Sequence, residues 1–306
     1  MKPLPASPTA IVLAFVAALL GATLLAAIAS PWAQAALAPI AVFPLHRVFV
    51  RLTMLFVLAI ALWLLLRHGL ANRATLGFTG PWQRFAGRAA LGLAAGVVLM
   101  MIAVLPLFLL QVRVWNGATP VVWTGWLPLL AKGLGTGLVV ALIEETFFRG
   151  AMQGALQRIG ATGWALCAVP LLYASVHFLG RPVGVPFQGV PYAQVNAWSG
   201  FTVLREFFAT LAHPLAIFDA CAALWCVGLL LALVRRRWDD LCGCIGLHAG
   251  FVATIVVFRK VSSPAPANQW SFLVGSFDGL LGWWIAVLAA IACLIVWRAG
   301  ARQLRG

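Results

Sequence analysis

Two adjacent carboxylates, Glu144 and Glu145, lie inside a long apolar segment of the chain. They are two of only seven acidic residues, and an ionised carboxylate near the centre of a membrane costs at least about 2.5 to 3.5 kcal/mol, so the pair points to a function. Glu145 precedes Arg149 by four residues, the spacing of an ion pair within one helix. Glu144 projects about 100° around the helix from Glu145. It can therefore face a cavity and act as a general base that activates water.

His177 lies in the next apolar segment, at a depth that matches Glu144. A turn between the two segments is marked by Gly160 and Gly163, with Glu144 16 residues before it and His177 14 residues after it. At a rise of 1.5 Å per residue, an antiparallel pair of helices places both side chains roughly 21 to 24 Å from the turn. We therefore expect Glu144 and His177 to share one site.

His248 lies in a third apolar segment and is flanked by glycines. Small residues at such spacings allow a second helix to approach closely. The flanking glycines are Gly243, Gly246 and Gly250, and the segment that carries Glu144 has its own small face at Gly133 and Gly137. We expect this packing to bring His248 against the helix that carries Glu144.

The composition places all three segments in a membrane. Of the 306 residues, 63% are hydrophobic and 9% are charged, and the mean hydropathy is +1.00. A water-soluble domain cannot bury so much apolar surface. We predict an all-α fold, a polytopic transmembrane bundle of about eight helices that forms a single membrane domain over residues 1–306. The predicted spans are 9–30, 48–66, 89–110, 129–157, 161–178, 207–234, 241–258 and 280–297.

Basic residues are distributed unequally between the two sets of loops. The net charge of +14 would suggest a nucleic-acid partner for a soluble protein, but these charges lie in short loops between apolar segments, so we expect none. With the N-terminus inside, twelve basic residues are cytoplasmic: Lys2, Arg67, Arg73, Arg84, Arg88, Arg158, Arg235, Arg236, Arg237, Arg298, Arg302 and Arg305. Seven lie on the other side: Arg47, Arg51, Arg113, Arg181, Arg205, Arg259 and Lys260. The positive-inside rule then predicts an integral protein of a bacterial inner membrane with both termini in the cytoplasm.

The first apolar segment leaves one alternative open. Lys2 precedes it, and Ala33-Gln34-Ala35 resembles the small-residue cleavage site of a signal peptide. The segment is long for that role, so we expect a transmembrane helix. Its removal would leave the orientation of the other seven segments unchanged.

Three motifs resemble those of the CAAX protease and bacteriocin-processing (CPBP, or Abi) family of intramembrane endopeptidases, whose patterns are EExxxR, FxxxH and HxxxN. Here the motifs read Glu144-Glu145-Thr-Phe-Phe-Arg149, Tyr173-Ala-Ser-Val-His177 and His248-Ala-Gly-Phe-Val252. They occur in the expected order, each on a predicted span. The first motif is fairly specific, whereas the other two would mean little alone. The resemblance covers a little over a third of the chain and implies a catalytic core at residues 129–258.

The resemblance also implies a site and a reaction. The bundle would enclose a cavity near the boundary between membrane and cytosol, and Glu144 with His177 would activate a water that attacks the carbonyl of a peptide bond. His248 would help to stabilise the oxyanion that forms. Glu145 and Arg149 would organise the site rather than react. The expected partners are a peptide or membrane-protein substrate and the lipid bilayer.

Position 252 departs from the family pattern. The third motif expects Asn or Asp there, and this chain has Val252. Loss of one oxyanion donor typically costs about 10² to 10³ in rate, so either another group supplies a donor or the reaction is slower or different. Thr254 is a nearby polar residue, but two positions along a helix it faces another direction.

The candidate site could work with or without a metal ion. Glu144, His177 and His248 could supply three ligands to zinc or another divalent metal and leave a position open for water. We favour a metal-free mechanism based on glutamate, because no HExxH-type pair prepares two ligands on one helix.

Two other classes of function stay open. A catalytically inactive membrane protein of the same fold, of a binding or immunity type, would keep the cavity to hold a peptide or a lipid tail, and Val252 favours this. A transporter would use the same residues to relay protons, but the chain has no repeated half. For a protease, the substrate could be a prenylated C-terminal peptide, a leader peptide or the membrane anchor of another protein.

Overall fold

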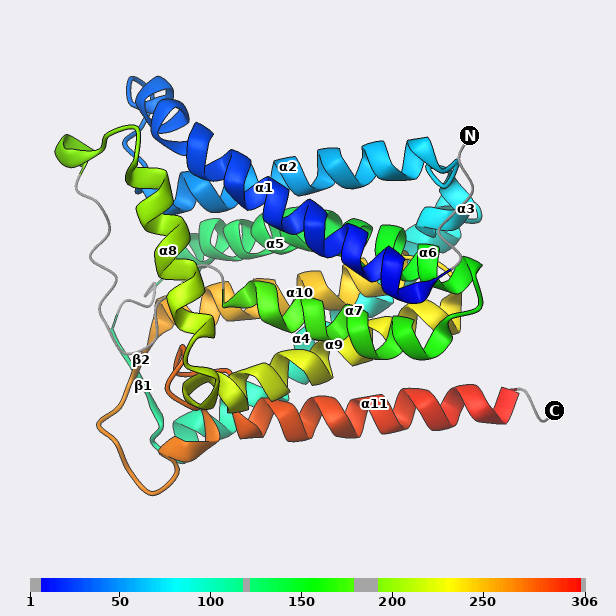
Figure 1. Cartoon of the computed structure of the whole chain (residues 1–306). Coiled ribbons are helices and arrows are strands. Elements are labelled where there is room, and N and C mark those ends of the chain that lie inside the picture. Colours follow the sequence, from blue (N-terminus) through cyan, green and yellow to red (C-terminus); the bar gives the residue numbers. More distant parts are fainter. Residues whose placement is uncertain (1–6, 118–121, 179–191, 304–306) are drawn as a thin grey trace.

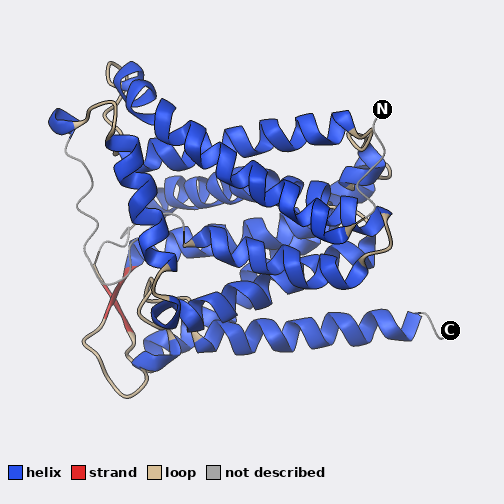
Figure 2. Cartoon of the chain, in the orientation of Figure 1, coloured by secondary structure: helices blue, strands red, loops and turns tan. Residues whose placement is uncertain are grey.

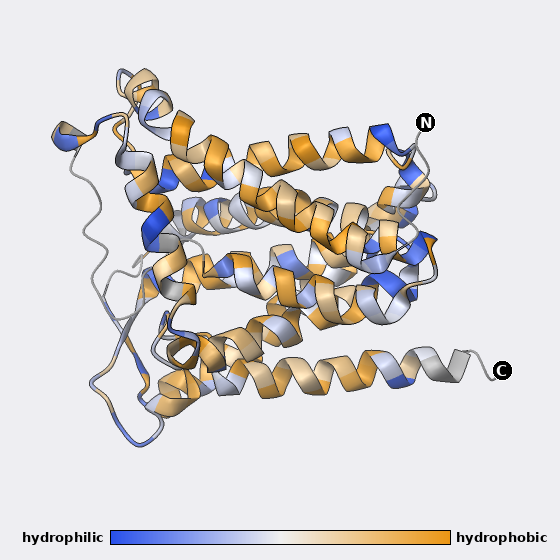
Figure 3. Cartoon of the chain, viewed as in Figure 1, coloured by the Kyte–Doolittle hydropathy of each residue, from blue (hydrophilic) through white to orange (hydrophobic). Residues whose placement is uncertain are grey.

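A bundle of long helices forms the molecule (Figure 1). The computed structural model describes residues 7–117, 122–178 and 192–303. Helix α1 begins and helix α11 ends at the same end of the bundle, and the strand pair lies at the other end (Figures 1 and 2). Apolar residues cover most of the length of the long helices, whereas many hydrophilic residues gather near helix ends (Figure 3). This distribution suits a bundle whose outer surface faces lipid.

The elements follow one another with short connections. The helices are α1 (Pro8–Leu37), α2 (Leu45–Arg67), α3 (Arg73–Leu76), α4 (Trp82–Leu109), α5 (Trp123–Glu145), the π-helix η1 (Thr146–Met152), α6 (Gln153–Arg158), α7 (Thr162–His177), the 3-10 helix η2 (Tyr192–Gln194), α8 (Ser199–Leu211), η3 (Pro214–Ile217), α9 (Phe218–Trp238), α10 (Cys242–Val261), η4 (Ser271–Leu273) and α11 (Trp283–Gln303). Strands β1 (Arg113–Trp115) and β2 (Ser262–Pro264) pair in antiparallel fashion, with Val114 opposite Ser263. This pair ties the end of α4 to the end of α10.

Seven helices of the described chain are long and apolar enough to cross a membrane. They are α1, α2, α4, the continuous segment Thr124–Arg158, the segment Pro214–Trp238, α10 and the Trp283–Gly300 part of α11. Helix α7 is shorter, with 16 residues, but its Val169 and Ala174 are fully buried in the bundle. Large apolar side chains on the outer surface suit contact with lipid tails. The prediction of a polytopic helical bundle is confirmed, and the protein is an integral membrane protein.

The sixth predicted span, 207–234, is wrong as a single helix. The chain forms α8 up to Leu211, breaks at His213, and begins α9 only at Phe218. Pro214 explains the break, because proline has no N–H to donate and disfavours a helical backbone at the residue before it. Helix α8 already begins at Ser199, ahead of the predicted start at residue 207.

Helix α10 lies at the centre of the bundle because glycines let its neighbours approach it. A Cβ atom placed on Gly246 would lie 2.0 Å from the carbonyl oxygen of Ala89 in α4. One placed on Gly137 of α5 would lie 2.4 Å from the carbonyl oxygen of Ala249 in α10. Neither contact leaves room for a side chain. The predicted packing of the His248 helix against the Glu144 helix is therefore confirmed.

Candidate active site

The two carboxylates of the first motif lie where an α-helix changes into a π-helix. Glu144 and Glu145 are the last residues of α5, and η1 follows at once. A π-helix bonds each N–H one residue further back than an α-helix does, and such turns are frequent at functional sites. Six consecutive residues of η1, 147–152, are buried. The wider turn thus directs charged and apolar side chains into the bundle together.

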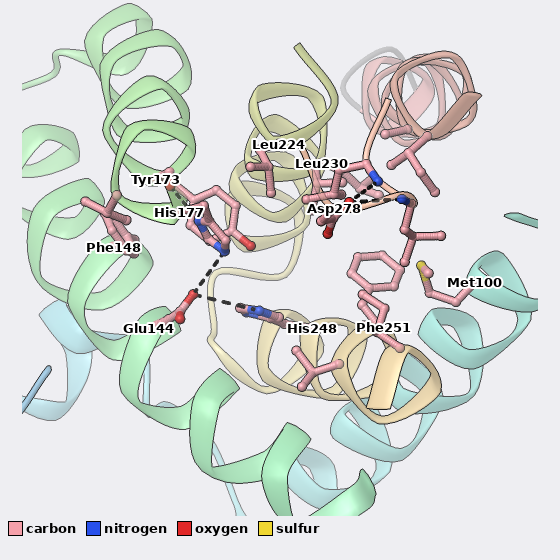
Figure 4. Close-up of a pocket in the computed structure, with 18 of the residues that line it drawn as sticks. Met100, Glu144, Phe148, Tyr173, His177, Leu224, Leu230, His248, Phe251 and Asp278 are labelled. Atoms are coloured by element: carbon pink, nitrogen blue, oxygen red, sulfur yellow. Dashed lines mark hydrogen bonds and ion pairs between the residues drawn. The ribbon is translucent and has the colours of Figure 1, made fainter. Parts of the chain in front are cut away.

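Glu144, His177 and His248 meet inside the bundle, although they come from α5, α7 and α10 (Figure 4). Oε2 of Glu144 lies 4.0 Å from Nε2 of His177 and 3.9 Å from Nε2 of His248. These separations are too long for direct hydrogen bonds and suit a bridging water molecule. Neither carboxylate oxygen of Glu144 accepts a hydrogen bond from any described residue. The three residues predicted from the sequence are therefore neighbours, while their catalytic roles stay a prediction.

A backbone hydrogen bond fixes the orientation of His177. Its Nδ1 lies 2.8 Å from the carbonyl oxygen of Tyr173. A carbonyl oxygen can only accept, so Nδ1 carries the hydrogen and donates it. Nε2 of the neutral ring then presents a lone pair toward Glu144. This is the tautomer that can accept a hydrogen bond from a water bound beside the carboxylate.

Glu145 orients His248 through a hydrogen bond. Its Oε1 accepts a hydrogen bond from Nδ1 of His248 at 2.8 Å and from Nη1 of Arg149 at 3.0 Å. The side chains of Glu145 and Arg149 are both 0% exposed, and Arg149 also donates to the carbonyl oxygen of Gly228 at 2.9 Å. The ion pair predicted from the i, i+4 spacing is present. The bond from Glu145 to His248 joins residues 103 positions apart, and no local pattern could have indicated it.

A cavity of about 520 Å³ opens from this cluster. Most of its wall is apolar, with contributions from α1, α2, α4, α9 and α11 as well as from the three helices of the cluster. Its wall includes the first half of α2 and α11 and the second half of α4 and α10, so it extends toward the end of the bundle where β1 and β2 lie (Figure 1). The side of the membrane that this end faces depends on the orientation of the chain, so the expected cavity near the cytosolic boundary stays a prediction.

The far end of the cavity carries a second carboxylate. Asp278 forms an ion pair with Arg259, and its Oδ1 accepts hydrogen bonds from the backbone N–H of Leu280 at 3.0 Å and Leu281 at 2.7 Å. Its side chain is 2% exposed. Sequence reasoning did not single out Asp278, because it lies in an irregular stretch without helical periodicity. Figure 4 shows it across the cavity from Glu144.

Arg113 adds positive charge near Arg259. Its guanidinium donates to the carbonyl oxygen and the hydroxyl of Ser262 and lies over the Phe258 ring, 5.1 Å from the ring centroid. Burial and, secondly, the neighbouring Arg259 lower the pKa of Arg113 from its usual value, against the opposing effect of Asp278. Two guanidinium groups thus lie close to the one carboxylate of Asp278.

The spacing of the cluster differs from that of a zinc site, while a metal-free mechanism stays a prediction. Ligands of a tetrahedral zinc at 2.0 to 2.1 Å lie about 3.3 Å apart, whereas Glu144 lies 3.9 and 4.0 Å from the two imidazoles. Among the residues that the structure describes, no group of three or more His, Cys, Asp or Glu side chains has the arrangement of a metal site.

Two further residues of the motifs can now be placed. Val252 lines the cavity with an aliphatic side chain. Thr254, the nearby polar residue, donates its hydroxyl hydrogen to the carbonyl oxygen of Gly250 at 2.9 Å, within its own helix. It therefore does not replace the missing Asn or Asp. Tyr173, which stands for the Phe of the second motif, also lines the cavity, with its ring centroid 4.4 Å from that of His177.

Comparison with known proteins agrees with the motifs. Residues 125–254 match the family model described as type II CAAX prenyl endopeptidase Rce1-like. No curated protein and no solved structure was found to match the chain. The matched segment runs from α5 to α10 and contains all three motifs, so the resemblance to the CAAX protease family is confirmed.

Proposed function

Since residues 125–254 are an Rce1-like domain of the CAAX protease family, we propose that this membrane protein hydrolyses a peptide bond with a water activated by Glu144 and His177. One observation carries the proposal. The Glu144 carboxylate is 13% exposed, faces a cavity and accepts no hydrogen bond from a described residue, although two imidazoles lie within 4.0 Å. A buried carboxylate left without donors is expensive unless a water or a substrate completes it.

The reaction follows from the positions of these groups. A water between Glu144 and His177 gives a proton to the carboxylate while its oxygen bonds to the carbonyl carbon of the substrate. The carbonyl oxygen becomes an oxyanion, which His248 stabilises through a hydrogen on Nε2. The C–N bond then breaks, and the proton held by Glu144 passes to the departing amine. The products are a carboxylic acid and an amine, and the enzyme is restored.

Glu145 and Arg149 act on this reaction through His248. The Glu145 carboxylate binds Nδ1 of His248 and so fixes the orientation of the ring, with Nε2 on the side of the cavity. Arg149 balances the charge of Glu145 and anchors it to the backbone of α9 through Gly228. The two residues are therefore proposed to position His248 and not to touch the substrate.

The proposed orientation places both termini in the cytoplasm of a bacterial cell. It is supported by the clustering of Arg235, Arg236 and Arg237 at the end of the bundle where α1 begins and α11 ends (Figure 1). A cysteine introduced into this loop should be labelled only from the cytoplasmic side of the membrane. Labelling only from the outside would reverse the orientation.

The proposed function can be tested through the substrates that the protein consumes. Membranes from cells that carry Glu144→Gln should accumulate uncleaved peptides or membrane segments that are absent from the wild type. Glu206→Gln is the matched control, since it neutralises a carboxylate on α8 that does not line the cavity. No accumulation with Glu144→Gln would favour the catalytically inactive binding protein, which the apolar side chain of Val252 also suits.

A further inference from the structure

One hydrogen-bond donor of the family pattern is missing from this cavity. Val252 follows His248 by four residues on α10, so both lie on the same face of the helix and both line the cavity. An Asn or Asp at this position would direct a polar group toward the region that His248 faces. Val252 offers only methyl groups there. The oxyanion therefore needs a second donor from another element.

Beside the cluster, the cavity contains a hydroxyl at a position where the family pattern has none. Tyr173 replaces the Phe of the second motif, is 2% exposed and lines the cavity. Figure 4 shows its hydroxyl pointing into the cavity, on the side where His177, Glu144 and His248 meet. No described residue forms a hydrogen bond with this hydroxyl. A buried tyrosine hydroxyl usually has a partner, so this one is available to a ligand.

The ring of Tyr173 is held firmly in this position. Phe148 packs edge-on against it at 5.4 Å between centroids, and the Arg149 guanidinium lies over its face at 4.5 Å. Gly228 makes room for it on α9, because a Cβ atom there would lie 3.0 Å from Cδ1 of the tyrosine ring. The His248 ring lies 6.0 Å from it at an interplanar angle of 80°. A donor fixed before the reaction stabilises a developing charge without reorganisation.

We propose that the Tyr173 hydroxyl is the second oxyanion donor, and that it takes over the task of the Asn or Asp that position 252 lacks. The inference rests on the proposed hydrolysis of a peptide bond. The hydroxyl donates a hydrogen bond to the carbonyl oxygen as that oxygen gains charge. It keeps its proton throughout, so the balance of the reaction is unchanged. Tyr173 is then a catalytic residue. Its hydroxyl supplies the second hydrogen bond to the oxyanion that the side chain at position 252 supplies in the family pattern.

The variant Tyr173→Phe tests this directly, because it removes a single oxygen and restores the residue of the family pattern. The purified full-length protein in liposomes would be assayed with a farnesylated fluorogenic peptide of the CAAX type. We expect kcat to fall about 10²- to 10³-fold, with KM changed less than about threefold, since the donor acts on the transition state. Ser175→Ala is the matched control: it removes a hydroxyl that donates to Leu171 within α7 and lies outside the cavity lining.

The double variant Tyr173→Phe/Val252→Asn provides the decisive comparison. It moves the donor back to the family's position and should recover at least about tenfold of the lost kcat. If Tyr173→Phe keeps the wild-type kcat while Glu144→Gln is inactive, the hydroxyl only packs and the inference is wrong, although the proposed function stands. If Glu144→Gln cleaves the peptide as fast as the wild type, or the wild type does not cleave it, the assignment of Tyr173 to this hydrolysis falls with its premise.

Discussion

The two ends of the cavity each present a buried carboxylate, and the two are surrounded differently. Asp278 forms an ion pair with Arg259 and accepts hydrogen bonds from two backbone N–H groups, and its side chain is 2% exposed. Glu144, at the other end, is 13% exposed and accepts no hydrogen bond from a described residue. Low exposure alone therefore does not distinguish the carboxylate that we propose to react from the structural one. The presence or absence of donors does, since an uncompensated buried polar group calls for a ligand.

Glu145 and Glu144 show the same contrast although they are adjacent in the sequence. Glu145 is 0% exposed and accepts hydrogen bonds from Arg149 and His248 through Oε1. Its neighbour Glu144 faces the cavity. The last two residues of α5 thus differ, since Glu145 is enclosed in the bundle and Glu144 lines the cavity. Substitutions of these two residues, and of Asp278 at the far end of the cavity, can break or sharpen the contrast.

The largest loss of stability is expected for Glu145→Gln. The change leaves Arg149 as a buried charge without its counterion, which typically lowers the free energy of unfolding by about 3 to 5 kcal/mol. Reversible unfolding in mixed detergent micelles would measure the difference. Glu144→Gln is the matched control and should stay within about 1 kcal/mol of the wild type, because no donor loses its acceptor. Equal stability of both variants would remove the distinction between Glu145 as a structural carboxylate and Glu144 as one that faces the cavity.

A smaller loss is expected at the far end, for Asp278→Asn. The amide keeps one acceptor oxygen but loses the charge that pairs with Arg259, so we expect about 1.5 to 3 kcal/mol of lost stability. The effect is below that of Glu145→Gln because the Arg259 side chain is 35% exposed and can be hydrated. Hydrolysis per folded molecule should fall less than about tenfold, which an activity assay normalised to folded protein would measure. A loss as large as that of Glu144→Gln would make Asp278 part of the chemistry.

The smallest effect is expected for Gln153→Leu, at a buried position of α6. Its Nε2 donates to the carbonyl oxygen of Ala232 at 3.1 Å, while its Oε1 has no partner among the described residues. Replacing a half-satisfied neutral amide by an apolar group of similar size should change the free energy of unfolding by about 1 kcal/mol or less. The same unfolding measurement applies. A loss of stability near that of Glu145→Gln would show that buried neutral groups matter as much as buried charges.

Much of the site could be predicted because simple geometry governs it. Similar distances from one turn placed Glu144 and His177 at one depth, and paired small residues placed His248 beside them. The i, i+4 spacing gave the ion pair of Glu145 and Arg149. These inferences needed only helices, which a membrane imposes on apolar segments.

The remaining features depend on contacts that no local pattern encodes. The π-helix η1 has no signature that the sequence analysis could use. The hydrogen bond between Glu145 and His248 and the direction of the Tyr173 hydroxyl result from contacts among three helices that are distant in the sequence. The break at His213 was foreseeable from Pro214, but apolar residues on both sides hid it in a hydropathy reading.

The central claim is that Glu144 activates water, and one measurement tests it most directly. The hydrolysis rate of the farnesylated peptide would be compared for wild type and Glu144→Gln in liposomes, before and after treatment with a chelator. We predict a fall of about 10²- to 10⁴-fold for Glu144→Gln, with unchanged unfolding, and no effect of chelation on the wild type. A Glu144→Gln protein as active as the wild type would contradict the claim. Wild-type activity that disappears with the chelator and returns with zinc would replace it by the metal-dependent mechanism.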